Sequence, residues 1–219
     1  MKVAALFEQT QKVGFVSHAP RLTVGRVAWK WLARMGAVSH GKAMRPLMLH
    51  RTCDLGPIRA VTADLKPTDV GCEAEFRLEG KVDAIRLPEP GPSVRTDDLW
   101  KTTCFEIFWQ PIGGTYYREF NLSPSSRWAA YDFDAFREGM RDAPVDAISL
   151  SHARASANGV GELVLKARIA SDLPTPAQVA LNAIVEHEDG TLQFWALAFP
   201  PGKAEFHSEA CRQLIVDRD

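Results

Sequence analysis

Residues 99–133 read LWKTTCFEIFWQPIGGTYYREFNLSPSSRWAAYDF, and this stretch is the most informative part of the 219-residue chain. Strand-like runs occupy residues 103–110, 115–123 and 128–133, and a Gly-Gly pair separates the first two runs. Alternating side chains and a short glycine turn are typical of antiparallel strands joined by a hairpin. The stretch therefore predicts an antiparallel sheet.

Alternation along the first two runs divides their side chains between two faces. The face expected to pack into a core carries Phe105, Ile107, Phe120 and Leu122. The opposite face carries Glu106, Tyr117, Glu119 and Asn121. A four-residue loop at 111–114 sets Glu106 across from Glu119, whereas a two-residue loop at 113–114 sets it across from Asn121. Both loops preserve this division, while an odd-length loop would mix the faces.

The rest of the chain also reads as short strands with turn residues between them. Further strands are expected over residues 58–66, 73–78, 82–87, 147–154, 162–169, 178–187, 192–199 and 212–216. Asn158-Gly159 and Asp189-Gly190 are hairpin signals, and residues 134–141 are compatible with one helical turn. About ten strands at this spacing predict an all-β fold, an antiparallel β-sandwich or jelly roll.

Charge divides the chain near residue 45. Residues 1–45 carry a net charge of +7 and the remainder −8. We therefore expect a basic N-terminal extension over 1–45 and a β-sandwich over 46–219. Within the extension, residues 24–35 have apolar and basic side chains on separate faces of a predicted helix. Three interpretations remain: an extension upstream of a true start at Met44, a helix packed on the domain, or a helix that binds a membrane surface or a partner.

Composition argues against several classes of function. A net charge of −1 does not favour a nucleic-acid binder, and no run of roughly 18 apolar residues predicts a transmembrane segment. The four cysteines lack the paired spacing of a zinc site, so no metal site is expected. Their spacing, with no signal-peptide pattern at the N-terminus, favours reduced thiols in the cytoplasm.

The two carboxylates on the polar face of the central hairpin need an explanation, because like charges on neighbouring strands repel. Either this face is solvated surface, or it binds a ligand. Tyr117, Trp100 and Trp128 lie close to the carboxylates in the sequence. Carboxylates and amides that bind hydroxyls, beside aromatic rings that stack on C–H surfaces, are suited to sugar recognition.

The chain resembles the bacterial DOMON-like proteins, relatives of the family 9 carbohydrate-binding modules. The resemblance covers residues 46–217 and rests on an ordered set of motifs. These are Leu99-Trp100-x-x-Thr103-Cys104-Phe105-Glu106-x-Phe108, Tyr117-x-Glu119-Phe120-Asn121-x-Ser123-Pro124, Trp128-Ala129-Ala130-Tyr131-x-Phe133, Phe136-Arg137-x-Gly139-Met140, Trp195-Ala196-Leu197 and Pro200 through Phe206-His207.

The resemblance implies a β-sandwich with a pocket for sugar or heme. It also implies ligand contacts from Arg95, Trp100, Glu106, Asn121, Trp128 and His207. Each of these has a structural alternative: the tryptophans as core aromatics, His207 as a structural histidine, and Arg95 paired with Asp97 or Asp98.

We therefore predict a non-catalytic protein that binds a carbohydrate or a related polyhydroxylated small molecule, without a cofactor. The predicted ligand-binding residues are Arg95, Trp100, Glu106, Tyr117, Glu119, Asn121, Trp128 and His207. Glu106 and Asn121 would bind hydroxyls, Trp100 and Trp128 would stack on the ligand, and Arg95 would offset carboxylate charge.

Two other functions remain open from the sequence. One is a heme-binding electron-transfer domain, in which Met48 or Met140 would pair with a histidine as axial ligands. The other is a hydrolase that uses Glu106 and Glu119 as its acid and base.

Overall fold

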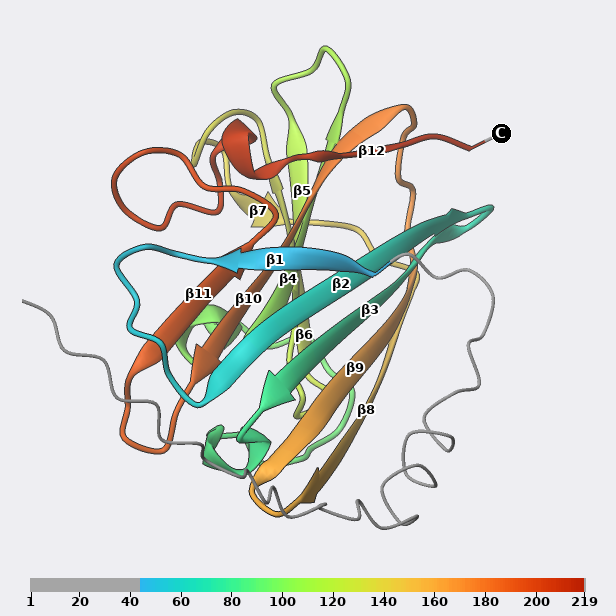
Figure 1. The fold of residues 1–219 in the computed structure, drawn as a ribbon. Helices are drawn as coiled ribbons and strands as arrows, with labels where there is room; N and C mark the ends of the chain where they lie inside the picture. Colours follow the sequence, from blue (N-terminus) through green and yellow to red (C-terminus); the bar gives the residue numbers. More distant parts are fainter. Residues whose placement is uncertain (1–43, 219) are drawn as a thin grey trace, which may run out of the picture. The chain divides into compact units, whose positions relative to one another are not determined.

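A computed structural model describes residues 44–218, which form an all-β sandwich of antiparallel strands (Figure 1). The strands are β1 (Arg45–Leu49), β2 (Ile58–Thr68), β3 (Gly71–Gly80), β4 (Cys104–Pro111), β5 (Tyr117–Leu122), β6 (Trp128–Phe133), β7 (Arg141–Asp142), β8 (Ala147–Ala157), β9 (Val160–Ala170), β10 (Ala177–Glu186), β11 (Leu192–Ala196) and β12 (Leu214–Val216). Three short 3₁₀ helices accompany them: η1 (Val82–Ala84), η2 (Leu99–Lys101) and η3 (Glu209–Cys211). The helix predicted over residues 24–35 lies outside the described residues, and the expected boundary at residue 45 stays a prediction.

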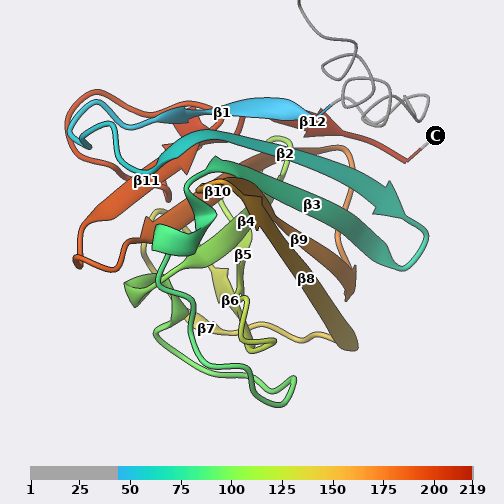
Figure 2. The ribbon, with the colours of Figure 1, turned by 60° about the horizontal axis from the view of Figure 1, so that its bottom comes forward.

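Strand β1 joins two layers of the sandwich. Its residues Arg45–Leu47 pair with β2, and Met48 and Leu49 pair with β11. Layer A is the run β1-β2-β3-β9-β8, and layer B is the run β7-β6-β5-β4-β10-β11, with β12 paired to β10. In Figure 2, β3, β9 and β8 of layer A lie to the right of β4, β5 and β6 of layer B.

The main hydrophobic core lies between the two layers. Phe76 of β3 meets Phe105 of β4 there, with ring centroids 5.1 Å apart. The side chains predicted to face the core are all fully buried in it: Phe105, Ile107, Phe120 and Leu122. The predicted division of faces along the central hairpin is therefore confirmed.

The register of the central hairpin matches the shorter of the two predicted loops. Glu106 lies across from Asn121, and Phe105 lies across from Leu122. The predicted Asn158-Gly159 hairpin between β8 and β9 is also present. Both turn residues have positive φ, 55° and 76°, which a type I′ turn requires.

Two local predictions were wrong. Residues 82–84 form η1 rather than a strand, since Val82 and Ile85 are both buried and lie one 3₁₀ turn apart. Residues 134–141 do not form a helical turn, because Arg137 and Gly139 have φ values of 57° and 66°, the left-handed region that interrupts a right-handed helix.

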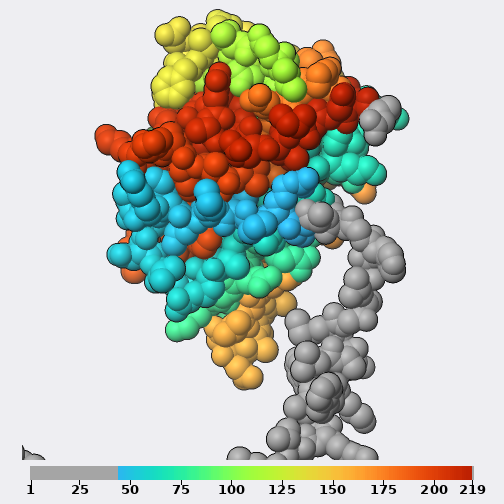
Figure 3. Space-filling model, turned by 45° about the horizontal axis from the view of Figure 1, so that its top comes forward, coloured from blue at the N-terminus to red at the C-terminus, as the bar shows by residue number. Residues whose placement is uncertain are grey.

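The other face of layer B carries a second apolar cluster, which the segments around residues 99–100 and 194–211 help to cover. Phe108 and Tyr117 of the central hairpin belong to it, together with Phe206 and Cys211 from the C-terminal part of the chain. In Figure 3 the C-terminal segments, in red, lie beside β1, in blue. A face that the hairpin alone would leave open is therefore enclosed by remote segments.

Candidate functional site

A cavity of about 430 Å³ lies over the second face of layer B. Its walls are largely aromatic: Trp100 from η2, Tyr131 and Phe133 from β6, Phe194 from β11, and Phe206. Its polar lining side chains are Glu106, Glu119, Arg137 and His207. Strands β4, β5 and β10 form its floor, because alternate residues of these strands point away from the main core.

The register places a row of polar side chains across the cavity floor. Glu106 of β4 lies between Asn121 of β5 and Asn182 of β10. All three side chains are at most 3% exposed, and we call them the polar row. Polar groups at this depth ordinarily have hydrogen-bond partners, and those left without one carry a desolvation cost.

Glu106 is the least satisfied of the cavity's charged side chains. Its Oε2 atom is buried without a hydrogen-bond partner among the described residues. Burial raises the pKa of Glu106 well above its usual range, and repulsion from Glu119 raises it further. The neighbouring amide of Asn182 opposes this pKa shift. Neither amide atom of Asn182 makes a hydrogen bond within the described part of the chain.

Glu119 is better supported than Glu106. The Asn121 Nδ2 atom donates a hydrogen bond to Glu119 Oε1 at 2.6 Å, and the Cys104 thiol lies 3.7 Å from Asn121 Oδ1. The other carboxylate oxygen, Oε2, lies 3.6 Å from His207 Nε2. Burial raises the pKa of Glu119 to about 7, against the opposing effects of Asn121 and Arg137. Near neutral pH, Glu106 and Glu119 together therefore retain at least part of a proton.

His207 is held in one orientation by Tyr117. The Tyr117 hydroxyl lies 2.8 Å from His207 Nδ1 and accepts a hydrogen bond from the backbone N–H of Arg137. Because Nε2 faces the carboxylate of Glu119, the favoured neutral form of His207 carries its proton on Nε2, and Nδ1 then accepts a hydrogen bond from the Tyr117 hydroxyl. Burial, with a smaller effect from the charge of Arg137, lowers the pKa of His207 to about 4. His207 is therefore a neutral donor facing Glu119.

An ion pair stands at the edge of the cavity. Arg137 donates two hydrogen bonds to Glu205, at 2.8 and 3.2 Å, and its side chain is half exposed. Its charge lowers the pKa values of Glu106, Glu119 and His207. Arg137 is nevertheless committed to Glu205 and makes no hydrogen bond to either cavity carboxylate.

Four of the predicted ligand-binding residues line the cavity: Trp100, Glu106, Glu119 and His207. Asn121 and Tyr117 lie behind them, where they position Glu119 and His207. The solvated-surface interpretation of this face is wrong, since Glu106 is 3% exposed and Glu119 is 5% exposed.

Arg95 and Trp128 lie elsewhere, and their predicted roles are corrected by the structure. Trp128 pairs with Leu122 and packs against the main core, on the opposite side of layer B. Arg95 lies 5.0 Å from the ring of Trp128 and donates to the carbonyls of Ala130 and Ala143, at 2.6 and 2.7 Å. Its guanidinium group therefore joins β6 to the segment at Ala143, and it does not offset the charge of the cavity carboxylates.

The sequence analysis did not select Asn182, Arg137 or most of the aromatic walls. Asn182 had a visible signal, as a single polar residue within an apolar run at 179–185. Tyr131, Phe133 and Phe206 belonged to the family pattern but were not chosen. Nothing local marks Phe194, which reaches the cavity only because β11 pairs with β10.

Met140 and His207 line the same cavity, so the methionine and a histidine named for the heme alternative lie close together. Nδ1 of His207 is hydrogen-bonded to Tyr117, and Nε2 lies 3.6 Å from Glu119. Nε2 would have to turn away from that carboxylate to bind iron. Within residues 44–218, no group of three or more His, Cys, Asp or Glu side chains could hold a metal ion, and no helix is long and apolar enough to cross a membrane.

Comparison with known proteins gives a likeness of fold. Neither a protein-family model nor a curated protein sequence matches this chain. A candidate carbohydrate-binding protein from Bacteroides uniformis is similar, with a TM-score of 0.54 and 14% identity over 85% of this chain and 89% of that one. A family 9 carbohydrate-binding module from Caldicellulosiruptor kristjanssonii, solved with cellotriose, gives a TM-score of 0.39 and 9% identity over 73% of this chain and 74% of that one. The first match shows that the two chains share a fold.

Proposed function

We propose that this chain is a non-catalytic ligand-binding protein whose cavity takes a carbohydrate or a related polyhydroxylated small molecule. The observation that carries this proposal is the cavity itself, with two buried carboxylates on its floor and five aromatic residues in its walls. Carboxylates bind pairs of hydroxyls, and aromatic faces bind the apolar C–H surface of a sugar ring.

Glu106 is the residue on which binding should depend most. Its Oε2 atom is without a partner in the described chain, so a ligand hydroxyl would satisfy an atom that is otherwise buried alone. A hydrogen bond to a charged or shared-proton carboxylate is worth about 1.5–3 kcal/mol. Trp100 would contribute a stacking surface, and His207 Nε2 would supply a donor beside Glu119.

The fold likeness to the Bacteroides protein is consistent with this proposal, and the DOMON-like motifs in the sequence point the same way. We infer that the chain is a distant member of the DOMON-like β-sandwich proteins.

The test is a calorimetric titration of the full chain with a panel of neutral mono- and disaccharides. Glu106→Gln should weaken any binding about 10- to 100-fold, as expected for loss of one charge-assisted hydrogen bond. The matched control is Glu79→Gln, because Glu79 lies on β3 in layer A and is exposed. Saturable binding that Glu106→Gln weakens and Glu79→Gln preserves would support the proposal, and the absence of binding to any sugar would contradict it.

A hydrolase is the alternative use of the two cavity carboxylates, and a separate incubation with aryl glycosides distinguishes it from binding alone. Aryl glycosides incubated with the chain should remain intact. Release of the aryl group by the wild type, lost in Glu106→Gln, would make the two carboxylates an acid–base pair.

A further inference from the structure

The cavity carboxylates lack a committed cationic partner. Arg137 is held by Glu205 through two hydrogen bonds. Arg212 lies over the ring of Tyr117, 4.5 Å from its centroid, and donates to the His207 carbonyl. Within residues 44–218, therefore, no lysine or arginine forms an ion pair with Glu106 or Glu119, and the close histidine is neutral.

The aromatic walls are suited to a cation. Trp100, Tyr131, Phe133, Phe194 and Phe206 line the same space as the two carboxylates. The face of an aromatic ring attracts an ammonium group, most strongly where water is excluded. A neutral sugar would use the rings for stacking, but the two carboxyl groups would then keep the proton that their raised pKa values hold near neutral pH.

We propose that the ligand of this cavity is a hydroxylated molecule carrying a protonated amine, whose ammonium group lies between Glu106 and Glu119. This inference rests on the proposed function and narrows its ligand class to amino sugars and similar amino polyols. Glu106 is 3% exposed, and its buried Oε2 atom, without a partner in the described chain, would accept a hydrogen bond from the ammonium group. Glu119 Oε2 would accept a second one on the side that faces His207.

Charge compensation by the ligand makes binding depend on pH. A cation beside Glu106 and Glu119 lowers both raised pKa values, so binding releases protons and strengthens as the pH rises toward about 7. The other titratable or charged groups that act on this pair, or lie around it, are Asp97, Cys104, Tyr117, Tyr131, Arg137, Glu205, His207, Cys211 and Arg212. Burial raises the pKa values of both thiols and both tyrosines, so these groups stay protonated over the range that matters.

The test compares three probes with one ring skeleton, which are glucosamine, glucose and N-acetylglucosamine, and a fourth, choline, as a cation without a sugar ring. Glucosamine carries the ammonium group, and the other two sugars are neutral. At pH 7 the full chain should bind glucosamine about 10- to 100-fold more tightly than glucose, as expected for charge-assisted hydrogen bonds in place of neutral ones. Titrations in buffers of different ionisation enthalpy should show proton release with glucosamine and none with glucose.

Variants separate this inference from the proposed function. Glu119→Gln keeps the acceptor for Asn121, and it should reduce the preference for glucosamine toward that of a neutral sugar. Glu79→Gln should change nothing, and circular dichroism confirms that each variant folds. Glucose that binds as tightly as glucosamine would overturn the amine while leaving the sugar role intact. Choline binding without any sugar binding, or no binding at all, would overturn both.

Discussion

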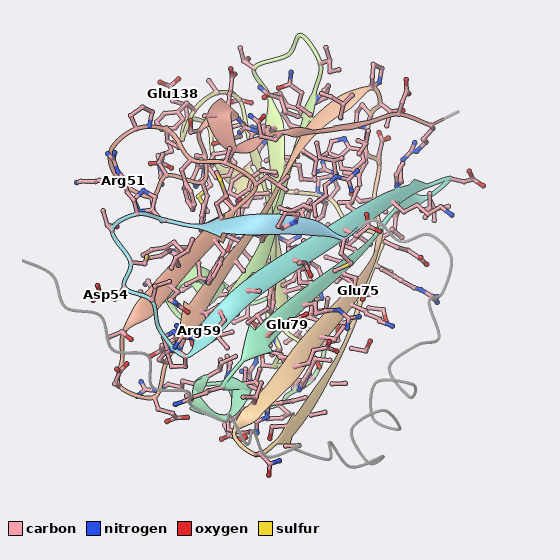
Figure 4. The ribbon with its side chains drawn as sticks, viewed as in Figure 1. Arg51, Asp54, Arg59, Glu75, Glu79 and Glu138 are labelled. Carbon is pink, nitrogen blue, oxygen red and sulfur yellow. The ribbon has the colours of Figure 1, made fainter. Side chains whose placement is uncertain are left out.

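Both layers of the sandwich carry carboxylate side chains that are largely buried, but the surroundings of these carboxylates differ between the layers. On the outer face of layer A, Glu75 of β3 lies 3.1 Å from Arg77 and 3.9 Å from Lys166, and Arg77 also contacts Glu162 of β9. Figure 4 labels Glu75 and Glu79 along β3. On the cavity face of layer B, Glu106 and Glu119 have no lysine or arginine in an ion pair among the described residues.

Burial alone does not separate the two regions. Glu75 is 8% exposed and Glu106 is 3% exposed, yet Glu75 is paired across the sheet while Glu106 retains an unpartnered oxygen. The difference teaches that a cation within ion-pair distance, on the same strand or on the next one, decides a carboxylate's role. A cation there makes the carboxylate part of the scaffold, and its absence leaves the carboxylate available to a ligand.

A buried ion pair elsewhere in layer B should give the largest change in stability when it is broken. Arg118 and Asp132 are both buried and joined by hydrogen bonds of 2.7 and 3.0 Å. Arg118→Ala leaves Asp132 buried without its cation, with the Tyr116 hydroxyl as its remaining donor, and should cost about 3–5 kcal/mol of unfolding free energy in urea. Loss of less than about 1 kcal/mol would mean that buried charges in this sandwich relax to solvent.

The pH dependence of stability tests whether Glu119 lacks a compensating cation in the folded state. Its folded pKa, about 7, exceeds the usual glutamate pKa of 4.5. The folded state therefore holds the proton more tightly, and stability is lost as the pH rises from about 4.5 to about 7, on the order of 3 kcal/mol. The lowered pKa of His207 acts in the opposite direction between pH 6.5 and about 4.

Comparing Glu119→Gln with the wild type isolates the Glu119 contribution. The variant should be more stable relative to the wild type at pH 8 than at pH 5, measured by urea denaturation at both values. Equal differences at the two pH values would mean that Glu119 is compensated in the folded state, as Glu75 is.

The histidine beside Glu119 allows a smaller test. Tyr117→Phe removes the donor to His207 Nδ1, so the ring loses a hydrogen bond that favours its Nε2–H tautomer. We expect about 1 kcal/mol of destabilisation, and imidazole nitrogen NMR shifts that move from one tautomer toward a mixture. Unchanged shifts would show that Glu119 alone orients the ring.

Removing Arg77 from the outer face of layer A should give the smallest change in stability. Arg77→Ala breaks the ion pairs of Arg77 with Glu75 and Glu162, and Arg77 is about one-third exposed. We expect a change below about 1 kcal/mol that shrinks further in 1 M salt. A loss of stability similar to that of Arg118→Ala would mean that the ion pairs of Arg77 contribute as much as a buried ion pair does.

The sequence predicted the central hairpin well, because strand alternation is a local property. It placed Glu106, Glu119 and Asn121 on one face and limited the register to two alternatives. It did not predict that this face is buried, since its cover comes from segments near residues 99 and 206 that pack only in the folded chain.

The errors have physical causes too. Trp128 was expected at the ligand, but its pairing with Leu122 turns it to the main core. Strand β1 was not predicted because it is five residues long and contains Pro46, which favours edge positions. Strand β7 has only two residues, too few to give a pattern.

The most direct measurement is a crystal structure of the full chain with the tightest-binding sugar or amino sugar of the panel. We predict the ligand in the 430 Å³ cavity, against Trp100, with a hydroxyl or ammonium group within hydrogen-bond distance of Glu106 Oε2. A ligand bound on the outer face of layer A, or a cavity closed by side chains in the complex, would contradict the account.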